Sequence, residues 1–278
     1  MPTSPCPRSR FLRTIGVLVA GSGLALTTAC GGSSGGTANG VQLVKAKTLT
    51  VCTHLPYKPF EFTKGGKVVG FDASMLQKLA DDLGVKMNVV SIGWNQITGG
   101  AAFAANQCDL GMGAATITPE RKKSVQFSDP YFNATQALLV TKKSPYKGLA
   151  DLKGKKLGVQ TDTTGQIYAN KYAKKYGYTT VVFDDSLSEF NAVKTGAVDA
   201  AINDNGPEYN FANQNSGAEV TKEFNTGEHY GFMAKKGDAN ATKLVNRLNT
   251  VIAKTKKDGS YQQIFKKWFG TAPKNVNG

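Results

Sequence analysis

The sequence predicts an α/β protein made of two lobes. Short apolar stretches alternate twice with helical stretches, first over 48–116 and again over 156–203. Extended segments near 136–141 and 229–233 join the two units. Strands that alternate with helices form a parallel sheet, whose ligands bind at the carboxyl ends of the strands. The cleft between two such lobes is a preferred place for a small ligand.

The first unit opens with a strand over 48–53. Asp72 then caps a helix with apolar residues at helical spacing, and Gly84 ends it. The rest of this unit is expected to be a strand over 85–92, a helix over 95–106, a strand over 109–116 and a helix that starts at Thr118-Pro119.

The second unit repeats the pattern. Ser186 and Glu189 form a capping box at the start of one of its helices. Two closing helices, over 240–256 and 260–269, have no strand of their own and are expected to pack on the first lobe. The elements of the second unit are strands over 156–160, 179–183 and 198–203, and helices starting at Thr164, Ser186 and Pro207.

The amino terminus has the composition of a secretory signal peptide. Three arginines precede the apolar stretch Thr14–Leu26, and small residues lead to Cys30. The apolar stretch is shorter than the roughly 18 residues of a membrane span. We therefore expect a cleaved signal over 1–29. Cys30 is either a modified residue, as the next segment suggests, or an incidental cysteine after an ordinary signal peptide.

A Gly/Ser-rich tract follows Cys30 and cannot bury apolar surface. A cysteine between a signal and such a tract resembles the lipobox of bacterial lipoproteins. That resemblance implies a lipid on Cys30, a flexible tether over 30–46 and a location at the outer face of the cytoplasmic membrane.

The formal charge of the 278 residues is +14, and removal of residues 1–30 takes away three arginines and leaves +11. The lysines are scattered in pairs, as on solvated helix faces, so we expect no nucleic-acid partner. Attraction to an anionic membrane or cell wall remains a compatible role for the charge. The chain has only two histidines and no metal-ligand spacing, so no metal or cofactor is expected.

Arg121 is the first candidate for a binding residue. It lies in the first turn of the helix expected after Thr118-Pro119, where the macrodipole disfavours a cation unless an anion is near. A helix N-terminus together with an arginine is suited to a carboxylate or phosphate. The alternative is a simple ion pair with Glu120.

Asp204 is the second candidate, because it directly follows the strand over 198–203. A carboxylate there can hold an ammonium group. The alternative is a helix cap before Pro207. Arg121 and Asp204 on opposite sides of a cleft would together suit an amino-acid zwitterion.

Other candidates lie in loops at strand ends. The turn Thr161–Gly165 offers hydroxyl and N–H groups, although capping alone would also explain it. His54 and Tyr57 follow the first strand and Trp94 follows the second, where aromatic rings can hold a ligand's carbon atoms.

The mature chain resembles the polar amino-acid solute-binding proteins of ABC importers, bacterial extracellular solute-binding protein family 3. The resemblance covers nearly all of it in order. The matching segments are Tyr57–Phe62, Gly70–Asp72, Thr116–Arg121, Phe127–Tyr131, Leu152–Lys155, Val198–Ala200, Tyr261 and Lys266–Gly270.

The resemblance implies which residues bind the α-carboxylate and the α-ammonium of an amino acid. Arg121 would bind the α-carboxylate, helped by the backbone of Thr116 and by Thr163 or Thr164. Asp204 would bind the α-ammonium, together with the backbone carbonyls of Ala114 and Thr116.

The same resemblance places Tyr57 and Trp94 on either side of the ligand side chain, with His54 and Gln160 at its far end. His54 stands where many relatives carry an acid, which argues against a strongly cationic ligand. Asp162 stands where Gly is usual, so the geometry of its turn departs from the family pattern. Glutamine, glutamate and cystine-like side chains all remain open.

The family fold is the two-lobed periplasmic-binding-protein type II fold. It implies a first lobe over 47–138 plus 231–278, a second lobe over 139–230 and a two-segment hinge. The implied protein is an exported monomer that binds a free polar amino acid and delivers it to an ABC permease. The resemblance thus implies a binding protein and not an enzyme.

We also expect Cys52 and Cys108 to be free, buried thiols. If their strands are parallel with aligned carboxyl ends, Cys52 lies two residues before His54 and Cys108 eight before Thr116. An offset of six residues at about 3.3 Å each exceeds the roughly 7 Å limit for bridged Cα atoms.

Two alternatives to the transport function stand beside it. One is an exported enzyme resembling cyclohexadienyl dehydratase, in which Glu61, Glu208 or Asp204 would act as acid or base. The other is a sensory module that passes the ligand to a receptor.

Overall fold

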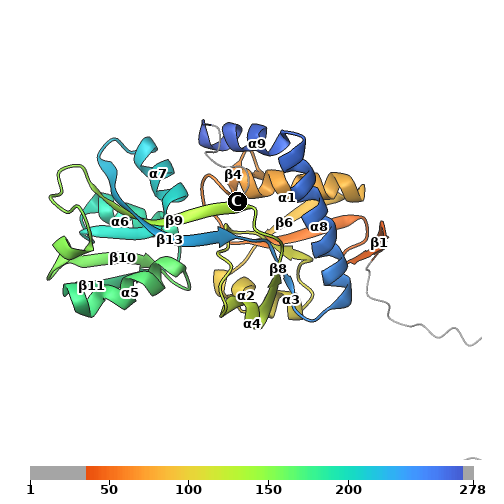
Figure 1. The fold of residues 1–278 in the computed structure, drawn as a ribbon, viewed down its shortest axis with the longest axis horizontal. Coiled ribbons are helices and arrows are strands. Elements are labelled where there is room, and N and C mark those ends of the chain that lie inside the picture. The colour runs from red at the N-terminus through yellow and green to blue at the C-terminus, as the bar shows by residue number, and fades with distance from the viewer. Residues whose placement is uncertain (1–35, 272–278) are drawn as a thin grey trace, which may run out of the picture. The chain divides into compact units, whose positions relative to one another are not determined.

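A computed structural model describes residues 36–271. The expected signal peptide, Cys30 and the first part of the expected tether lie outside the described residues. The elements form two five-stranded mixed sheets and two small hairpins. Figure 1 shows how the labelled helices and strands are arranged. This architecture confirms the predicted α/β class. Within 36–271, no helix has both the length and the apolar character needed to cross a bilayer.

In the first sheet four strands run in the same direction, and β14 (Met233–Lys235) runs antiparallel to its two neighbours. The strands in spatial order are β6 (Lys86–Ser91), β3 (Thr48–Thr53), β7 (Leu110–Gly111), β14 and β8 (Val125–Phe127). β3 is buried along almost its whole length, as expected for a central parallel strand. Its carboxyl end leads directly to His54 and the loop that follows.

Three helices contribute to the core of the first sheet: α1 (Phe71–Leu83), α8 (Ala239–Lys257) and α9 (Ser260–Phe269). In α1, Met75, Leu76 and Leu79 are fully buried, and Gly84 ends the helix in the left-handed conformation that glycine adopts readily. Packing of α8 and α9 against α1 confirms the expected return of the closing helices to the first unit.

The second sheet has the order β11 (Thr179–Phe183), β10 (Lys156–Gln160), β12 (Ala200–Asp204), β9 (Phe132–Thr141) and β13 (Ala218–Tyr230). Its first three strands are parallel and confirm the second predicted unit. Three α-helices and a 3₁₀ helix belong to it: α5 (Thr164–Tyr176), α6 (Ser186–Thr195), α7 (Asn205–Gln214) and η1 (Leu149–Leu152).

The long strands β9 and β13 pair antiparallel, from Phe132 opposite Tyr230 to Thr141 opposite Ala218 (Figure 1). The sequence predicted extended segments only near 136–141 and 229–233, which overlap the second part of β9 and the end of β13. A bridge between Thr116 and Tyr230 joins the end of β13 to the loop that follows β7. These two strands thus carry the chain between the two sheets.

Several elements differ from the sequence prediction. The helix expected over 95–106 is divided at Gly99-Gly100 into α2 (Trp94–Thr98) and α3 (Ala101–Ala104). Residues 36–43, expected to belong to the tether, form a hairpin of β1 (Gly36–Ala38) and β2 (Val41–Leu43), because Val41 and Leu43 bury their side chains in the core. A second hairpin, β4 (Phe62–Lys64) and β5 (Lys67–Val69), was not predicted.

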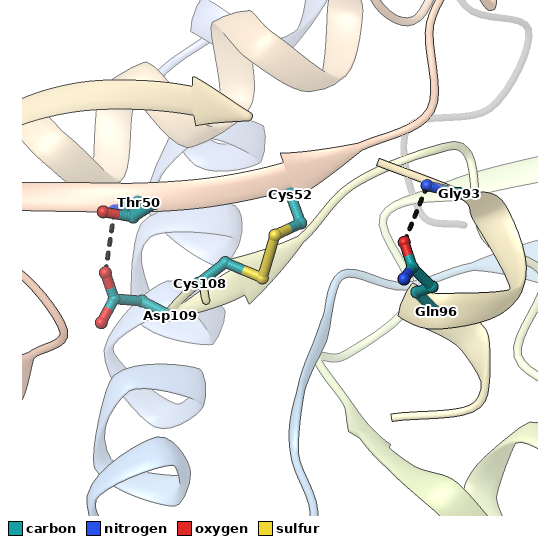
Figure 2. The surroundings of a disulfide bond; sticks show 6 residues. All are labelled: Thr50, Cys52, Gly93, Gln96, Cys108 and Asp109. Carbon is teal, nitrogen blue, oxygen red and sulfur yellow. Dashed lines mark hydrogen bonds between the residues drawn. A yellow bond between two sulfur atoms is a disulfide. The ribbon is translucent and has the colours of Figure 1, made fainter. Parts of the chain in front are cut away.

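The prediction that Cys52 and Cys108 are free thiols is wrong. They form a disulfide, with their Cα atoms 5.7 Å apart (Figure 2). The error lies in the strand expected over 109–116, because β7 contains only Leu110 and Gly111. Cys52 lies opposite Gly111, three residues beyond Cys108 rather than six. Residues 112–116 leave the sheet, so their number does not measure distance along it.

The disulfide is expected to make a large contribution to stability, because it links two segments 56 residues apart. Replacing both cysteines by serine should lower the free energy of unfolding by about 2–5 kcal/mol. Denaturant unfolding of the double variant and of the reduced wild type provides the measurement. Equal stability of oxidised and reduced wild type would contradict the expectation.

Candidate functional site

A cavity brings together loops from both sheets. Its empty volume is about 370 Å³ when the open solvent at its mouth is included. All ten residues predicted to bind ligand contribute to its lining, together with Glu61 and Gly113. The lining residues are His54, Tyr57, Glu61, Trp94, Gly113, Ala114, Thr116, Arg121, Gln160, Thr163, Thr164 and Asp204.

Arg121 is held by backbone carbonyls and by an aromatic ring. Its Nη1 donates to the carbonyl oxygen of Thr116 (3.1 Å) and its Nη2 to that of Asp162 (2.8 Å). The guanidinium carbon lies 5.3 Å from the centroid of Trp94, a cation–π contact. These contacts fix the guanidinium beside the cavity and leave other N–H groups of its fork for an anion.

The helix-dipole argument for Arg121 is wrong, because α4 (Arg121–Ser124) has only four residues. Glu120, the partner of Arg121 in the alternative interpretation, pairs instead with Lys123. Burial lowers the pKa of Arg121, and the negative charges of Asp162 and Asp204 oppose that shift. An arginine retains its charge under such a shift, because its ordinary pKa is far above neutrality.

Asp204 ends β12 and is buried. Its Oδ2 accepts hydrogen bonds from the hydroxyls of Tyr57 (3.0 Å) and Tyr230 (2.5 Å), and its Oδ1 accepts one from Nε2 of Gln136 (2.6 Å). The side chain makes no capping hydrogen bond to α7, although capping was the alternative interpretation. Hydrogen bonds from Tyr57, Tyr230 and Gln136 therefore position the carboxyl, and capping of α7 does not.

The electrostatic environment of Asp204 favours its protonated form. Burial is the largest effect and the charge of Glu228 the next, and together they raise the pKa of Asp204 to about 7. The hydrogen bonds from Tyr230, Tyr57 and Gln136 act in the opposite direction. A cation placed beside this carboxyl would stabilise its ionised form.

Glu228 and Gln136 form a hydrogen-bond network that the sequence reading missed. Oε2 of Glu228 accepts from the hydroxyls of Thr116 (2.7 Å) and Thr164 (2.8 Å), and its Oε1 accepts from Nε2 of Gln136 (3.0 Å). Thr116 follows the first sheet and Thr164 belongs to the second, so Glu228 connects the two sides of the cavity. Most of β13 was not predicted from the sequence. The pairing of β13 with β9 brings these two side chains together.

Asp162 makes a second connection across the cavity. Its backbone φ of 57° lies in the left-handed region, which aspartate tolerates better than most residues. Its carbonyl oxygen accepts from Nε1 of Trp94 (3.0 Å) as well as from Arg121. Its carboxylate accepts a hydrogen bond from the hydroxyl of Thr98. These hydrogen bonds connect the turn before α5 to Trp94, Thr98 and Arg121 on the opposite side of the cavity.

Capping accounts for the side chain of Thr163. Its hydroxyl accepts from the N–H of Gln166 (3.1 Å) and donates to the carbonyl of Gln160 (2.7 Å). The helix α5 has thirteen residues, and this cap leaves the N–H groups of Thr164 and Gly165 without intrahelical partners. An anion in the cavity could accept from these groups.

His54 and Gln160 each retain one buried polar atom without a partner. Nδ1 of His54 lies 2.9 Å from the carbonyl oxygen of Ile92, and its Nε2 has no partner. The amide nitrogen of Gln160 donates to the carbonyl of Asp184 (3.4 Å), and its Oε1 has no partner.

Glu61 and Asp72 form a buried carboxyl pair beside the cavity. Burial raises the pKa of Glu61 well above its ordinary value and that of Asp72 to about 6, and the negative charge of Asp72 raises the pKa of Glu61 further. Asp72 also accepts from the backbone N–H groups of Gly113 (3.3 Å) and Ala114 (2.9 Å). The pair therefore holds the irregular loop that leads to Thr116, whose shape depends on the positive φ of Gly113 and Ala114.

These buried carboxyls predict a pH dependence of stability. The folded pKa values of Asp72 and Asp204 are about 6 and about 7, above the ordinary value of 3.8. Groups with raised folded pKa values stabilise the protein below the unfolded pKa, and this stabilisation is lost as the pH rises through the folded pKa. The free energy of unfolding of the ligand-free protein should fall by about 2–4 kcal/mol between pH 5 and pH 8.

Denaturant unfolding at several pH values measures this effect. Asp204→Asn should make the decline shallower, because the amide does not titrate. Replacing the exposed Asp129 by asparagine should leave the slope unchanged. A free energy of unfolding that rises from pH 5 to pH 8 would contradict the expectation.

The fold and the cavity define a two-sheet ligand-binding protein, and comparison with known proteins specifies the family. Residues 49–271 match the profile of the bacterial extracellular solute-binding proteins, family 3, and the chain belongs to this family. Within residues 36–271, no three acidic, histidine or cysteine side chains are grouped to hold a metal ion.

The chain is 30% identical over 244 residues to the arginine-binding extracellular protein ArtP of Bacillus subtilis, covering 87% of this chain and 92% of that protein. It is 34% identical over 214 residues to the ABC transporter glutamine-binding protein GlnH of the same organism, covering 75% of each. A solved structure of an ancestral arginine-binding protein bound to arginine is similar, with a TM-score of 0.74 and 38% identity over 81% of this chain and 99% of that one.

Proposed function

We propose that this protein binds a free polar amino acid outside the cytoplasm and delivers it to an ABC permease. The observation that carries the proposal is the placement of Arg121 and Asp204, a cation and a carboxyl, on the lining of one cavity. The family and the names of the relatives support the same function.

The α-carboxylate of the ligand meets Arg121 in this proposal. Free N–H groups of the guanidinium provide charge-assisted hydrogen bonds, which are stronger than neutral ones. The unpaired N–H groups of Thr164 and Gly165 at the start of α5 add a second anion-binding element. Thr116 contributes its backbone, and Thr163 acts through the helix that it caps.

The α-ammonium meets Asp204, with the backbone carbonyls of Ala114 and Thr116 nearby on the lining. Aromatic faces of Tyr57 and Trp94 hold the ligand's carbon atoms, and their polar atoms are already hydrogen bonded to other residues. His54 and Gln160 face the side chain.

We propose lobes over 47–138 plus 231–278 and over 139–230, joined where β9 and β13 pass between the sheets. The ligand binds to one lobe, and the other lobe completes the contacts. Because contacts from both lobes are needed, bound ligand favours the closed form that a permease recognises. In the same proposal the monomeric protein is anchored by a lipid on Cys30 to the outer face of the cytoplasmic membrane.

We also propose that the ligand leaves unchanged. The carboxyls that a dehydratase-like mechanism would need have structural contacts. Asp204 is held by two tyrosines and Gln136, and Glu208 accepts from the backbone of Asn203. Glu61 is buried, and the charge of Asp72 raises its pKa further. These contacts support a binding protein over an enzyme.

The test is calorimetric titration of the purified protein with each of the twenty amino acids, followed by mass spectrometry of the recovered ligand. Tight binding of one or a few polar amino acids, recovered intact, is the expected result. Binding of none would overturn the proposed function, and a chemically altered ligand would establish an enzyme.

A further inference from the structure

The polar lining of the cavity is divided between two kinds of groups. Arg121 and the start of α5 serve an α-carboxylate, and Asp204 serves an α-ammonium. The remaining side-chain atoms are left for the ligand's side chain, and their hydrogen-bonding character decides which side chains fit. Among the described lining residues, the buried side-chain atoms without a partner belong to His54, Glu61 and Gln160.

The free atom of His54 is an acceptor in the neutral ring. Nδ1 lies beside the carbonyl oxygen of Ile92, which can only accept, so Nδ1 carries the hydrogen. In the neutral imidazole, Nε2 is then the nitrogen without a hydrogen, and it can only accept.

The free atom of Gln160 is also an acceptor. Its amide nitrogen donates to the carbonyl of Asp184, and this contact orients the amide so that Oε1 remains without a partner. The hydroxyl of Ser186, two residues after Asp184, donates to the carbonyl of Pro56, two residues after His54 (3.4 Å). This contact brings the chain segments next to His54 and Gln160 together, and both residues line the cavity.

Glu61 adds a third acceptor. Both of its carboxyl oxygens are buried without a hydrogen-bond partner, as is Oδ1 of the neighbouring Asp72. One proton shared by the two carboxyls would satisfy one oxygen of each. The other oxygen of Glu61 is left to accept.

We propose that this part of the cavity selects amino acids whose side chains end in N–H groups, such as an amide, a guanidinium or an ammonium, and rejects side-chain carboxylates. The inference rests on the proposed function and narrows its ligand. A side-chain carboxylate would place further acceptors against unpaired acceptors, and a hydrocarbon would leave them unpaired. Sites that pair with a donor discriminate strongly against an analogue that lacks it.

The experiment is calorimetry at pH 8 with the twenty amino acids and with two matched pairs, glutamine against glutamate and lysine against norleucine. We expect the tightest ligand to end in an N–H group. Glutamine should bind about 100-fold or more tightly than glutamate. A tightest ligand whose side chain ends without an N–H group would overturn the inference while leaving the proposed function intact.

Two variants test whether Gln160 provides the selection. Gln160→Met is similar in size but lacks the acceptor, and it should reduce the preference for the N–H member of each pair by about tenfold. Gln214→Met, on the exposed part of α7, is the matched control and should leave the preference unchanged. An unchanged preference in Gln160→Met would overturn the role of this residue. Failure of wild type to bind any amino acid would instead overturn the proposed function.

Discussion

Replacing Arg121 by alanine is expected to weaken amino-acid binding by about 100- to 1,000-fold. The guanidinium lies beside the cavity, fixed by the carbonyls of Thr116 and Asp162 and by the face of Trp94. Removing one partner of a buried charge pair costs about 2–5 kcal/mol, because the ligand carboxylate would be left desolvated and unpaired. Calorimetric titration of wild type and variant with the same ligand measures the loss.

Two further variants define the role of Arg121. Arg121→Lys keeps the charge but loses the fork and the stacking on Trp94, so its affinity should fall between those of wild type and the alanine variant. Lys122→Ala removes an exposed charge from the next position and should bind like wild type. An alanine variant within threefold of wild type would refute the carboxylate role.

Replacing Asp204 by asparagine is expected to weaken binding by about 100-fold at pH 8. The carboxylate is the expected partner of the ligand's ammonium, whereas the amide carries no charge and can turn N–H donors toward it. Tyr57 and Tyr230 can still donate to the amide oxygen, so the fold around the site should persist. Circular dichroism and calorimetry on the same sample separate misfolding from loss of affinity.

The pH dependence of binding gives an independent test of Asp204. Its pKa is about 7, because of burial and of the facing charge of Glu228, and the ligand's ammonium binds the ionised form. Lowering the pH from 8 to 6 should therefore weaken binding by up to about tenfold in wild type. Asp204→Asn should lose most of this dependence. Equal pH profiles for the two proteins would show that another group controls binding.

The candidate site could be predicted from sequence because most of its residues follow predicted strands. Asp204 is the last residue of β12, and His54 is the first residue after β3. Strand signals locate such positions without knowledge of the packing, whereas the cap predicted at Asp72 was wrong because Gly70 is the N-cap of α1. The sequence also predicted α5 and its start at Thr164.

The remaining features depend on contacts between distant segments. Glu228 and Gln136 meet only because β13 pairs with β9, and no local pattern marks that pairing. The disulfide was excluded by counting residues along a strand expected over 109–116, whereas β7 ends at Gly111. Arg121 was assigned to the first turn of a helix, and that helix ends after one turn, although the side chain still reaches the cavity.

The disulfide also bears on the entropy of binding. Cys52 lies two residues before His54, and Cys108 precedes the short strand from which the loop to Ala114 and Thr116 continues (Figure 2). A covalent link between these two segments limits their relative motion before any ligand arrives. The ligand then has fewer chain segments to order, so less of its interaction energy is lost to immobilisation. Oxidation of the two thiols thus preorganises one half of the site.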